Sequence, residues 1–363
     1  MNRNAGSGGG SAEDWIFADI GGTWARFAHW RPGIGAGSVA RWPADRFDSF
    51  GAALEAYQRS LPMRVPRAAI AIATQLRDTR IRMTNRHWTF DARDLHAATG
   101  LDTLLLVNDF AGAAAGLPAL VGDEAGVVRA APGLAGHWLL IGPGTGLGAA
   151  ALFGVGSTRE RVLASEAGHM GFAASEAALD GLRDLALQRW SRVSWERILS
   201  GNGLSLLHAW QSRLAQEAAQ ADGGRAHGTQ TDTAMLPAAQ ISALVSAGDP
   251  VALETARWFS RLLGSFAGDL CLAFGIDGGL WLTGGVFDGI GSGFDATAFL
   301  EAFDDKGRYA ARQRTVPVRR VQVADLAFRG LARIVSGACA VPALLVTAQG
   351  VLEVDGLPNR RAA

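Results

Sequence analysis

Cysteine is scarce in this chain, which has only two among its 363 residues. Cys271 and Cys339 lie far apart in largely apolar segments. Their spacing matches neither a zinc site nor a disulfide framework. The sequence therefore predicts a protein of a reducing compartment, and the cytoplasm is the simplest assignment.

An excess of charge is also absent, because 34 Lys and Arg residues balance 34 Asp and Glu residues. No global field attracts nucleic acid or an anionic membrane. The longest stretch without these charged residues, 130–158, contains Pro132, Pro143 and many glycines, which disfavour a membrane-spanning helix. No G-x-x-x-x-G-K-[ST] motif occurs, which excludes a P-loop. We expect small-molecule partners, with no nucleic acid and no membrane.

The length of 363 residues, with 48% hydrophobic and 19% charged residues, suits two folded domains. Residues 1–13 lack the apolar core of a secretory signal and are expected to form a disordered tail. Residues 218–233 are rich in Ala, Gly, Gln and Thr, which predicts a mobile loop. Residues 342–363 are expected to be a C-terminal extension, ordered if 344–354 finds a sheet edge.

The most informative stretch is 104–110, LLLVNDF, an apolar run that ends in an amide and a carboxylate. Such a run predicts a buried strand of an α/β sheet, with chemistry just past its carboxyl end. Asp109 could there act as a general base for a substrate hydroxyl, and the Asn108 amide could donate to and accept from a polyol. Asn108 also fits the cap of a helix that starts near Ala111. Both interpretations remain open from these residues alone.

Residues 15–30 predict a strand that ends near Asp19, a glycine turn and a second strand. Gly21, Gly22 and Thr23 in the turn offer bare backbone N–H groups and a hydroxyl that can approach a phosphate. Asp19 could hold a cation or its water. A plain hairpin with a glycine turn explains the same pattern.

A second strand, glycine loop and strand unit runs from 137 to 153. Its loop, GPGTGLG, alternates glycines with Pro143, Thr145 and Leu147. The segment 146–151 also spells G-x-G-x-x-A, a weak dinucleotide motif, but a strand and not a helix is expected to follow it.

Three further polar or glycine-rich sites follow along the chain. Glu166 and His169 are three residues apart in a glycine-containing loop, where they could ligate a metal, hold sugar hydroxyls or form an ordinary surface contact. Glu196 precedes what resembles another glycine-rich turn. Gly284 and Gly285 follow a predicted strand at 279–282 and clear space beside its end.

Apolar periodicity predicts the remaining elements. Helices are expected at 48–60, 91–98, 176–190, 250–274 and 325–336, and strands at 68–73, 80–83 and 89–90. Strands first, and then alternation with helices, favour a mixed α/β sheet covered by helices.

The order of the motifs is more specific than any one of them. Along the chain they read DIGGTxAR, NDF, GPGTGLG, EAGHMGF, ERILSGNGL, TGGVF and FDDKGR. This series resembles the bacterial glucokinase family, within the actin-like sugar kinase and ATPase superfamily, over about residues 15–338. The related ROK kinases carry a cysteine-rich zinc motif after their histidine, whereas residues 168–192 contain no cysteine. The chain is therefore more similar to the zinc-free branch.

The resemblance implies a two-domain actin-like (ribonuclease H-like) α/β fold. A small domain of 14–109, rejoined by about 326–341, and a large domain of 110–325 would enclose a cleft. The implied activity is ATP-dependent phosphorylation of glucose at the 6-hydroxyl, the entry to glycolysis. The partners would be glucose and ATP with Mg²⁺ bound through ATP, and the family suggests a homodimer.

The resemblance also assigns roles to residues. Asp109 matches the catalytic base, and glucose would be held by Asn108, Asp109, Glu166, His169 and Glu196. Asp19 could take part in holding Mg²⁺. The positions matched to nucleotide binding are Asp19, Gly21, Gly22, Thr23, Gly142, Gly144, Thr145, Gly146, Gly284 and Gly285.

Two positions depart from the family pattern. Trp24 follows the GGT turn where the family usually has Asn, and Thr74-Gln75 stands where Cys-Pro or Gly-Pro is common. The alternatives are a kinase for another hexose or an amino sugar, and a non-catalytic sugar-binding sensor whose phosphate loop is altered at Trp24.

Overall fold

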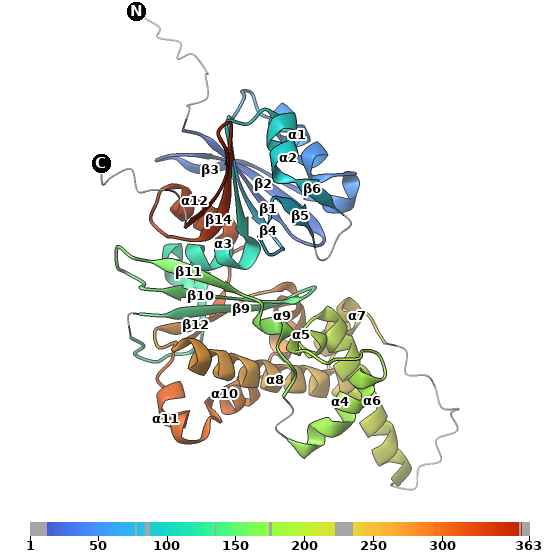
Figure 1. Ribbon diagram of the computed structural model, residues 1–363. Helices are drawn as coiled ribbons and strands as arrows, with labels where there is room; N and C mark the ends of the chain where they lie inside the picture. Colours follow the sequence, from blue (N-terminus) through green and yellow to red (C-terminus); the bar gives the residue numbers. More distant parts are fainter. Residues whose placement is uncertain are drawn as a thin grey trace, which may run out of the picture. The chain divides into compact units, whose positions relative to one another are not determined.

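The computed structural model describes residues 13–76, 78–83, 88–134, 136–173, 176–221, 235–355 and 357 (Figure 1). Residues 1–12 of the expected tail and 222–233 of the expected loop lie outside the described residues. The chain divides into two compact units. The first contains Met1–Val121, Leu152–Ala164 and Val323–Ala363, and the second contains Gly122–Ala151 and Ser165–Gln322.

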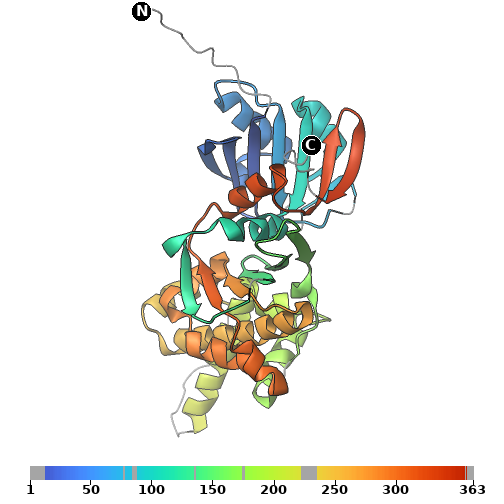
Figure 2. The same cartoon turned by 90° about the vertical axis from the view of Figure 1, so that its left-hand side faces the viewer.

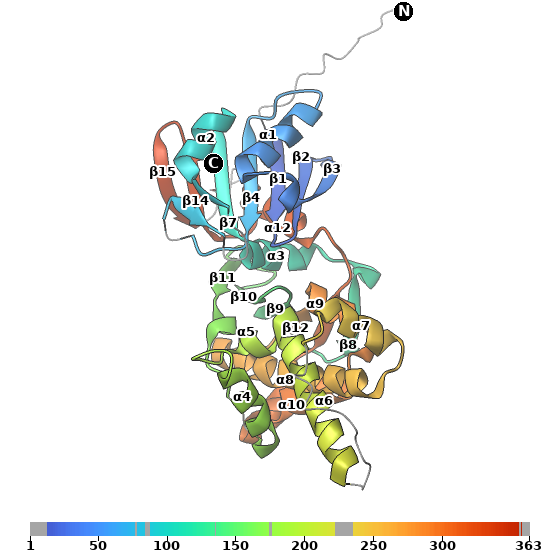
Figure 3. The same ribbon diagram turned by 90° about the vertical axis from the view of Figure 1, so that its right-hand side faces the viewer.

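The first unit is built on a seven-stranded sheet in the order β15-β14-β7-β4-β1-β2-β3 (Figure 3). Strands β1, β4 and β7 are parallel to one another, and the other strands join the sheet antiparallel to their neighbours. The strands are β1 (Trp15–Ile20), β2 (Trp24–Arg31), β3 (Gly35–Pro43), β4 (Arg67–Ile72), β7 (Thr103–Asn108), β14 (Pro342–Thr347) and β15 (Gly350–Asp355). A separate ribbon pairs β5 (Arg80–Arg82) with β6 (Thr89–Asp91).

Helices cover both faces of this sheet. Helices α1 (Phe50–Ser60) and α2 (Ala92–Thr99) contribute to the apolar core on one face. Helices α3 (Asp109–Gly116) and α12 (Leu326–Val335) pack on the other face. Because both faces are covered, the central strands β4 and β7 are almost continuously apolar and buried, as is typical of parallel strands.

Helices α3 and α12 approach each other unusually closely, and glycine makes this possible. A Cβ atom on Gly330 would lie 1.7 Å from the carbonyl oxygen of Gly112. Helix α3 begins at Asp109, so this contact helps to fix the helix that carries the predicted base.

The C-terminal segment is part of the same sheet. Strand β14 pairs with β7 over Ala343–Thr347, and β15 pairs with β14 (Figure 2). The segment 344–354 was expected to be ordered if it joined the edge of a sheet, and it does join one. The residue range of each predicted domain stays a prediction, although the compact units and the predicted domains share many residues.

The second unit contains a six-stranded sheet in the order β11-β10-β9-β12-β13-β8. Strands β9, β12 and β13 are parallel, and β8 is antiparallel to β13. The strands are β8 (Ala125–Arg129), β9 (Trp138–Pro143), β10 (Leu147–Phe153), β11 (Arg161–Ser165), β12 (Gly279–Leu282) and β13 (Val318–Val321). The stretch Leu152–Ala164, from the end of β10 into β11, groups with the first unit.

Helices make up most of the rest of the second unit. They are α4 (Asp180–Leu187), α5 (Trp195–Ile198), α6 (Gly201–Ala221), α7 (Ala238–Ser246), α8 (Pro250–Phe274), α9 (Gly285–Ile290), α10 (Ala296–Asp304) and α11 (Ala310–Gln313). The predicted helix 250–274 is confirmed: Asp249 caps it at Ala252 N, Pro250 starts it and Gly275 ends it in the left-handed conformation. No described helix is long and apolar enough to cross a membrane.

Two sequence predictions in this unit were wrong. The helix expected over 176–190 is shorter, because a 3-10 turn at Ala177–Leu179 precedes α4. The glycine-rich turn expected after Glu196 is instead the first turn of α6, where Gly203 N donates to Ser200 Oγ at 3.2 Å. Gly203 is needed there for packing, since a Cβ would lie 2.1 Å from the Ile198 carbonyl oxygen.

Candidate active site

The carboxyl end of β7 places Asn108 and Asp109 at the start of α3. Asn108 has extended backbone angles, and its Oδ1 accepts the N–H of Ala111 at 3.0 Å. Its Nδ2 donates to the Thr74 carbonyl oxygen at 3.2 Å. The helix-cap interpretation of Asn108 is therefore confirmed. This role does not prevent Asn108 from binding a ligand. Its side-chain amide has two N–H donors and two lone pairs, and the two bonds use one donor and one lone pair.

Asp109 is the first residue of α3, and its Oδ1 accepts the N–H of Phe110 at 2.9 Å. The N-terminus of a helix stabilises a negative charge, which suits a carboxylate that is to act as a base. The residue as a whole is partly buried.

The first glycine turn joins β1 to β2 and is closed by backbone bonds. Gly21 N donates to the Trp24 carbonyl oxygen at 3.1 Å, and the Thr23 carbonyl oxygen accepts Ala44 N at 3.0 Å. These bonds fix the turn against the end of β3 and leave Thr23 exposed. The predicted hairpin is confirmed, and its geometry is compatible with phosphate binding.

Asp19 lies at the end of β1, directly before this turn, and is buried. Arg26 donates hydrogen bonds to the Asp19 carboxylate and to the Ala324 carbonyl oxygen. Burial raises the pKa of Asp19 above its ordinary value, while the positive charge of Arg26 opposes that rise. Arg26 thus holds Asp19 in place beside the turn.

Trp24 does not disrupt the turn that precedes it. Its side chain is 38% exposed, and the Arg41 guanidinium lies 4.0 Å from its ring centroid. Trp24 pairs with Pro43 across β2 and β3, so the ring lies at the turn end of this strand pair. The family usually has Asn at this position, and the backbone of the turn is also closed with Trp24 there.

In the second unit the structure brings Glu166, His169 and Glu196 together. His169 Nε2 lies 3.8 Å from a Glu166 carboxylate oxygen, and His169 Nδ1 lies 3.8 Å from Glu196 Oε1. A bridge between Gly171 and Ser194 joins the two loops that carry these residues. Both distances exceed a normal hydrogen bond, so these atoms keep hydrogen-bonding capacity for a ligand.

Glu196 also contacts the second glycine loop. Its Oε2 accepts the N–H of Leu147 at 3.0 Å. A Cβ on Gly146 would lie only 2.4 Å from that same oxygen, so a larger residue here would require the Glu196 side chain to move. The loop itself is held by Gly144, whose N–H donates to the Gly146 carbonyl oxygen at 2.8 Å and whose carbonyl oxygen accepts Gly201 N at 2.9 Å.

Gly284 lies at the end of β12 against the second glycine loop. It has a φ of 109°, and a Cβ there would lie 2.4 Å from the Pro143 carbonyl oxygen. Both features require glycine. Gly285 begins α9 next to it.

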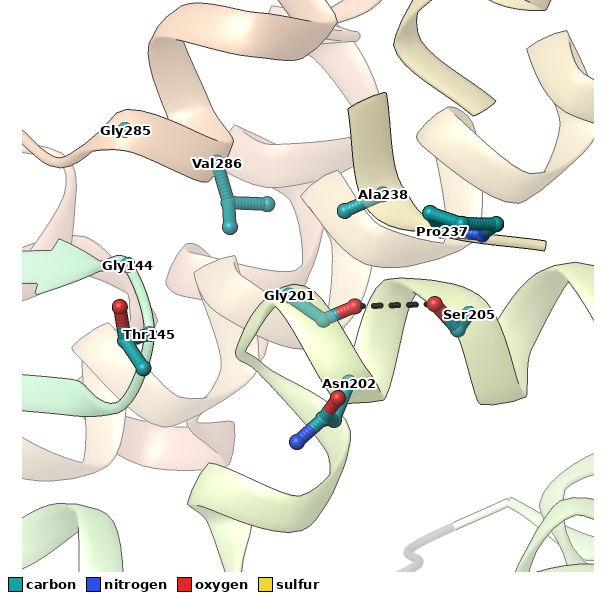
Figure 4. Close-up of a pocket in the computed structure, with 9 residues that line it drawn as sticks. All are labelled: Gly144, Thr145, Gly201, Asn202, Ser205, Pro237, Ala238, Gly285 and Val286. Atoms are coloured by element: carbon teal, nitrogen blue, oxygen red, sulfur yellow. Dashed lines mark hydrogen bonds between the residues drawn. The ribbon is translucent and has the colours of Figure 1, made fainter. Parts of the chain in front are cut away.

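A pocket of about 440 Å³ opens beside these glycines (Figure 4). Its lining combines glycines, which expose their backbone, with small polar and apolar side chains. The lining residues are Gly144, Thr145, Gly201, Asn202, Ser205, Pro237, Ala238, Gly285 and Val286. Sequence reasoning identified only Gly144, Thr145 and Gly285 in this set.

The predicted site residues therefore fall into two groups. Asp19, the Gly21–Thr23 turn and the pair Asn108 and Asp109 belong to the first unit, and the remainder belong to the second. Among the described residues, no group of three or more His, Cys, Asp or Glu side chains could hold a metal ion.

The family model described as glucokinase matches residues 16–338. The glucokinase of Chromobacterium violaceum is 38% identical over 329 residues, which cover 89% of this chain and 90% of that protein. A longer relative from Paraburkholderia xenovorans, named bifunctional protein glk, is 33% identical, and the match covers 88% of this chain but only 48% of the relative.

Solved structures agree with this likeness. A glucokinase from an Antarctic psychrotroph has a TM-score of 0.71 at 31% identity, covering 88% of this chain and 98% of that one. A ROK family glucokinase from Streptomyces griseus, in complex with glucose and AMPPNP, has a TM-score of 0.58 at 22% identity, covering 88% and 98%. The predicted actin-like α/β fold is confirmed.

Proposed function

The chain belongs to the glucokinase family, and we propose that it transfers the terminal phosphoryl group of ATP to the 6-hydroxyl of glucose. The reaction would yield glucose 6-phosphate and ADP, as in EC 2.7.1.2. The observation that carries this proposal is the position of Glu196. One of its carboxylate oxygens lies 3.8 Å from His169, and the other accepts a backbone N–H of the second glycine loop at 3.0 Å.

This arrangement supports a shared role in sugar and phosphate binding. Glu166, His169 and Glu196 offer carboxylate oxygens and ring nitrogens, which suit the hydroxyl groups of a neutral polyol. The glycine loop next to them offers backbone N–H groups without competing side chains, which suits a phosphate. A carboxylate that contacts both elements fixes the sugar site relative to the phosphate loop.

Asp109 is proposed as the base. As O6 of glucose forms its bond to the γ-phosphorus, the bond from that phosphorus to the β–γ bridging oxygen breaks, and the electron pair leaves with ADP. The Asp109 carboxylate takes the proton of the 6-hydroxyl. Phosphoryl transfer needs mainly an aligned alcohol and stabilised phosphate charge. One positioned carboxylate is therefore enough as the acid–base group of the protein.

The nucleotide is proposed to bind along the glycine segments. Gly21, Gly22 and Thr23 would contact phosphate oxygens, as would Gly142, Gly144, Thr145 and Gly146. The pocket lined by Gly285, Val286 and Asn202 has the size and mixed polarity that an adenosine moiety requires.

Mg²⁺ is proposed to accompany ATP. When bound, it would supply positive charge that shields the β- and γ-phosphates. Asp19 is the residue proposed to approach the ion or its water. A lone carboxylate fits this role, because Mg²⁺ in such sites takes one or two carboxylates together with phosphate oxygens and waters.

A coupled assay with Mg²⁺ and ATP across glucose, mannose, fructose and glucosamine tests the proposal. We expect glucose to give the highest kcat/KM, since the family match favours it. A higher kcat/KM for another of these sugars would replace glucose as the substrate. Binding of glucose without turnover of any sugar would instead support the non-catalytic sensor.

Cytoplasmic location and homodimer formation are also proposed, from family resemblance and the need for ATP. Sedimentation equilibrium of the purified protein tests the second point, and a mass of one chain at micromolar concentration would contradict it.

A further inference from the structure

The side chains of Trp24 and Arg41 stack on each other beside the first glycine turn. Arg41 Cζ lies 4.0 Å from the centroid of the Trp24 ring. The Trp24 carbonyl oxygen accepts the N–H of Gly21, so the residue that carries the indole also closes the turn. The turn is tied to the strand of Arg41 as well, through the bond from Ala44 N to the Thr23 carbonyl oxygen.

The strand register places this pair on the sheet face of Asp19. Asp19 is directly opposite Arg26 across β1 and β2, and Arg26 is directly opposite Arg41 across β2 and β3. Residues directly opposite one another point to the same face of a sheet, and so do residues two apart in one strand. Trp24 therefore shares this face with Asp19, Arg26 and Arg41.

The two arginines in this row have different partners. Arg26 is engaged by the Asp19 carboxylate and the Ala324 carbonyl oxygen. Arg41 is exposed and forms no ion pair with any carboxylate of the described residues. Its guanidinium rests on the indole ring. A guanidinium held on an aromatic face keeps its N–H edge available, and that edge matches the oxygens of a phosphate.

We propose that Arg41, held on the ring of Trp24, binds the terminal phosphates of the nucleotide and is a donor-recognition residue of the kinase. This inference rests on the proposed function. It also gives Trp24 a role: where the family usually has a hydrogen-bonding Asn, this chain has an aromatic ring that supports the Arg41 cation.

The test compares Arg41→Ala with Arg31→Ala. Arg31 is the last residue of β2, at the end of the strand away from the glycine turn, so its removal changes the net charge equally. Isothermal titration calorimetry measures the affinity of each protein for Mg·ATP and for AMP. Steady-state assays give kcat and the KM values for ATP and glucose.

We expect Arg41→Ala to weaken ATP binding and raise the ATP KM by about 5- to 20-fold, which is typical of losing one charge-assisted contact. AMP affinity and the glucose KM should stay within twofold of wild type, because the contact is to the terminal phosphates. Arg31→Ala should match wild type in all of these quantities.

A second pair of variants tests the aromatic support. Trp24→Phe keeps a ring under the guanidinium and should retain most of the ATP affinity, whereas Trp24→Ala should approach the Arg41→Ala value. A role in stability alone would lower the melting temperature of these variants without changing the ratio of ATP to AMP affinity.

Each outcome bears on the proposal. If Arg41→Ala binds ATP within twofold of wild type while wild type phosphorylates glucose, the inference is wrong and the proposed function stands. Equal losses of ATP and AMP affinity, or equal losses in Arg41→Ala and Arg31→Ala, would also overturn it. If wild type phosphorylates no sugar but its ATP affinity still depends on Arg41, the contact stands and the kinase assignment fails.

Discussion

Nδ1 of His169 lies 3.8 Å from Oε1 of Glu196, although a 3-10 turn and α4 lie between the two residues in the sequence. The same imidazole lies 3.8 Å from Glu166 through its other nitrogen. One ring therefore separates two carboxylates. A ligand that inserts between the ring and either carboxylate can exchange these long contacts for hydrogen bonds.

Replacing members of this cluster should weaken sugar binding. We expect Glu166→Gln, His169→Ala and Glu196→Gln each to raise the glucose KM, by an amount equivalent to about 1 to 3 kcal/mol for lost partners of bound hydroxyls. The ATP KM should change less. Steady-state kinetics with each substrate varied in turn measures both, and a selective loss of ATP affinity would contradict this grouping.

Asp109→Asn should separate binding from chemistry. An amide can still hydrogen-bond a hydroxyl but cannot take its proton, so kcat should fall by about 10² to 10⁴-fold, as is usual when a general base is removed. Glucose affinity, measured by calorimetry, should remain close to wild type. A variant that kept more than about a tenth of wild-type turnover would leave Asp109 with a structural role only.

Gly146→Ala should disturb the sugar site from the phosphate loop. Its new Cβ would lie 2.4 Å from Glu196 Oε2, so the carboxylate must shift. That shift would disturb the bond between Oε2 and Leu147 N and the position of Oε1 beside His169. We expect glucose affinity to fall by about tenfold, the loss of one charge-assisted bond.

Gly144→Ala is the matched control for glucose affinity, because a Cβ there meets nothing within 4 Å. Calorimetric titration with glucose compares the two variants. Equal affinities would show that the Glu196 carboxylate adapts without cost.

The raised pKa of Asp19 predicts a pH dependence of stability. Burial makes the folded protein bind this proton more tightly than the unfolded chain does. The resulting stabilisation is complete below the unfolded pKa, near 4, and is lost as the pH rises through the folded pKa. The free energy of unfolding of wild type minus that of Asp19→Asn should therefore decrease with rising pH.

Urea denaturation of both proteins between pH 4 and pH 8 measures this difference. A difference that grows with pH would mean that the charge of Arg26 outweighs burial and lowers the pKa of Asp19.

Local signals explain which elements could be predicted from the sequence. Asp249, Pro250 and Gly275 mark the ends of α8 by their own backbone chemistry, and the predicted range matches the observed helix. The start of α6 was missed because Gly201 and Gly203 are typical of a turn, whereas here Gly203 allows α6 to pack against Ile198. Such packing depends on residues that contact the glycine in the folded protein, and it produces no pattern in the sequence around the glycine.

The site shows the same limit. The proposed roles of Glu166, His169 and Glu196 came from motif order, and only the structure shows that both carboxylates lie 3.8 Å from one imidazole. Pro237 and Ala238 line the pocket from a segment without any motif. The contact of the Trp24 ring with Arg41 could not be inferred from the sequence, because Arg41 lies on another strand.

Strand β14 lies beyond the end of the family match, which matters for any truncation of the chain at that point. The family match ends at residue 338, whereas β7, which leads into Asn108 and Asp109, is paired along Thr103–Val107 with residues 343–347. A protein cut at 338 would leave the backbone edge of β7 unpaired next to the predicted base. Exposed edges of this kind recruit strands from other molecules. Expression of the matched region alone should therefore yield self-associated material, even though every motif of the family is present.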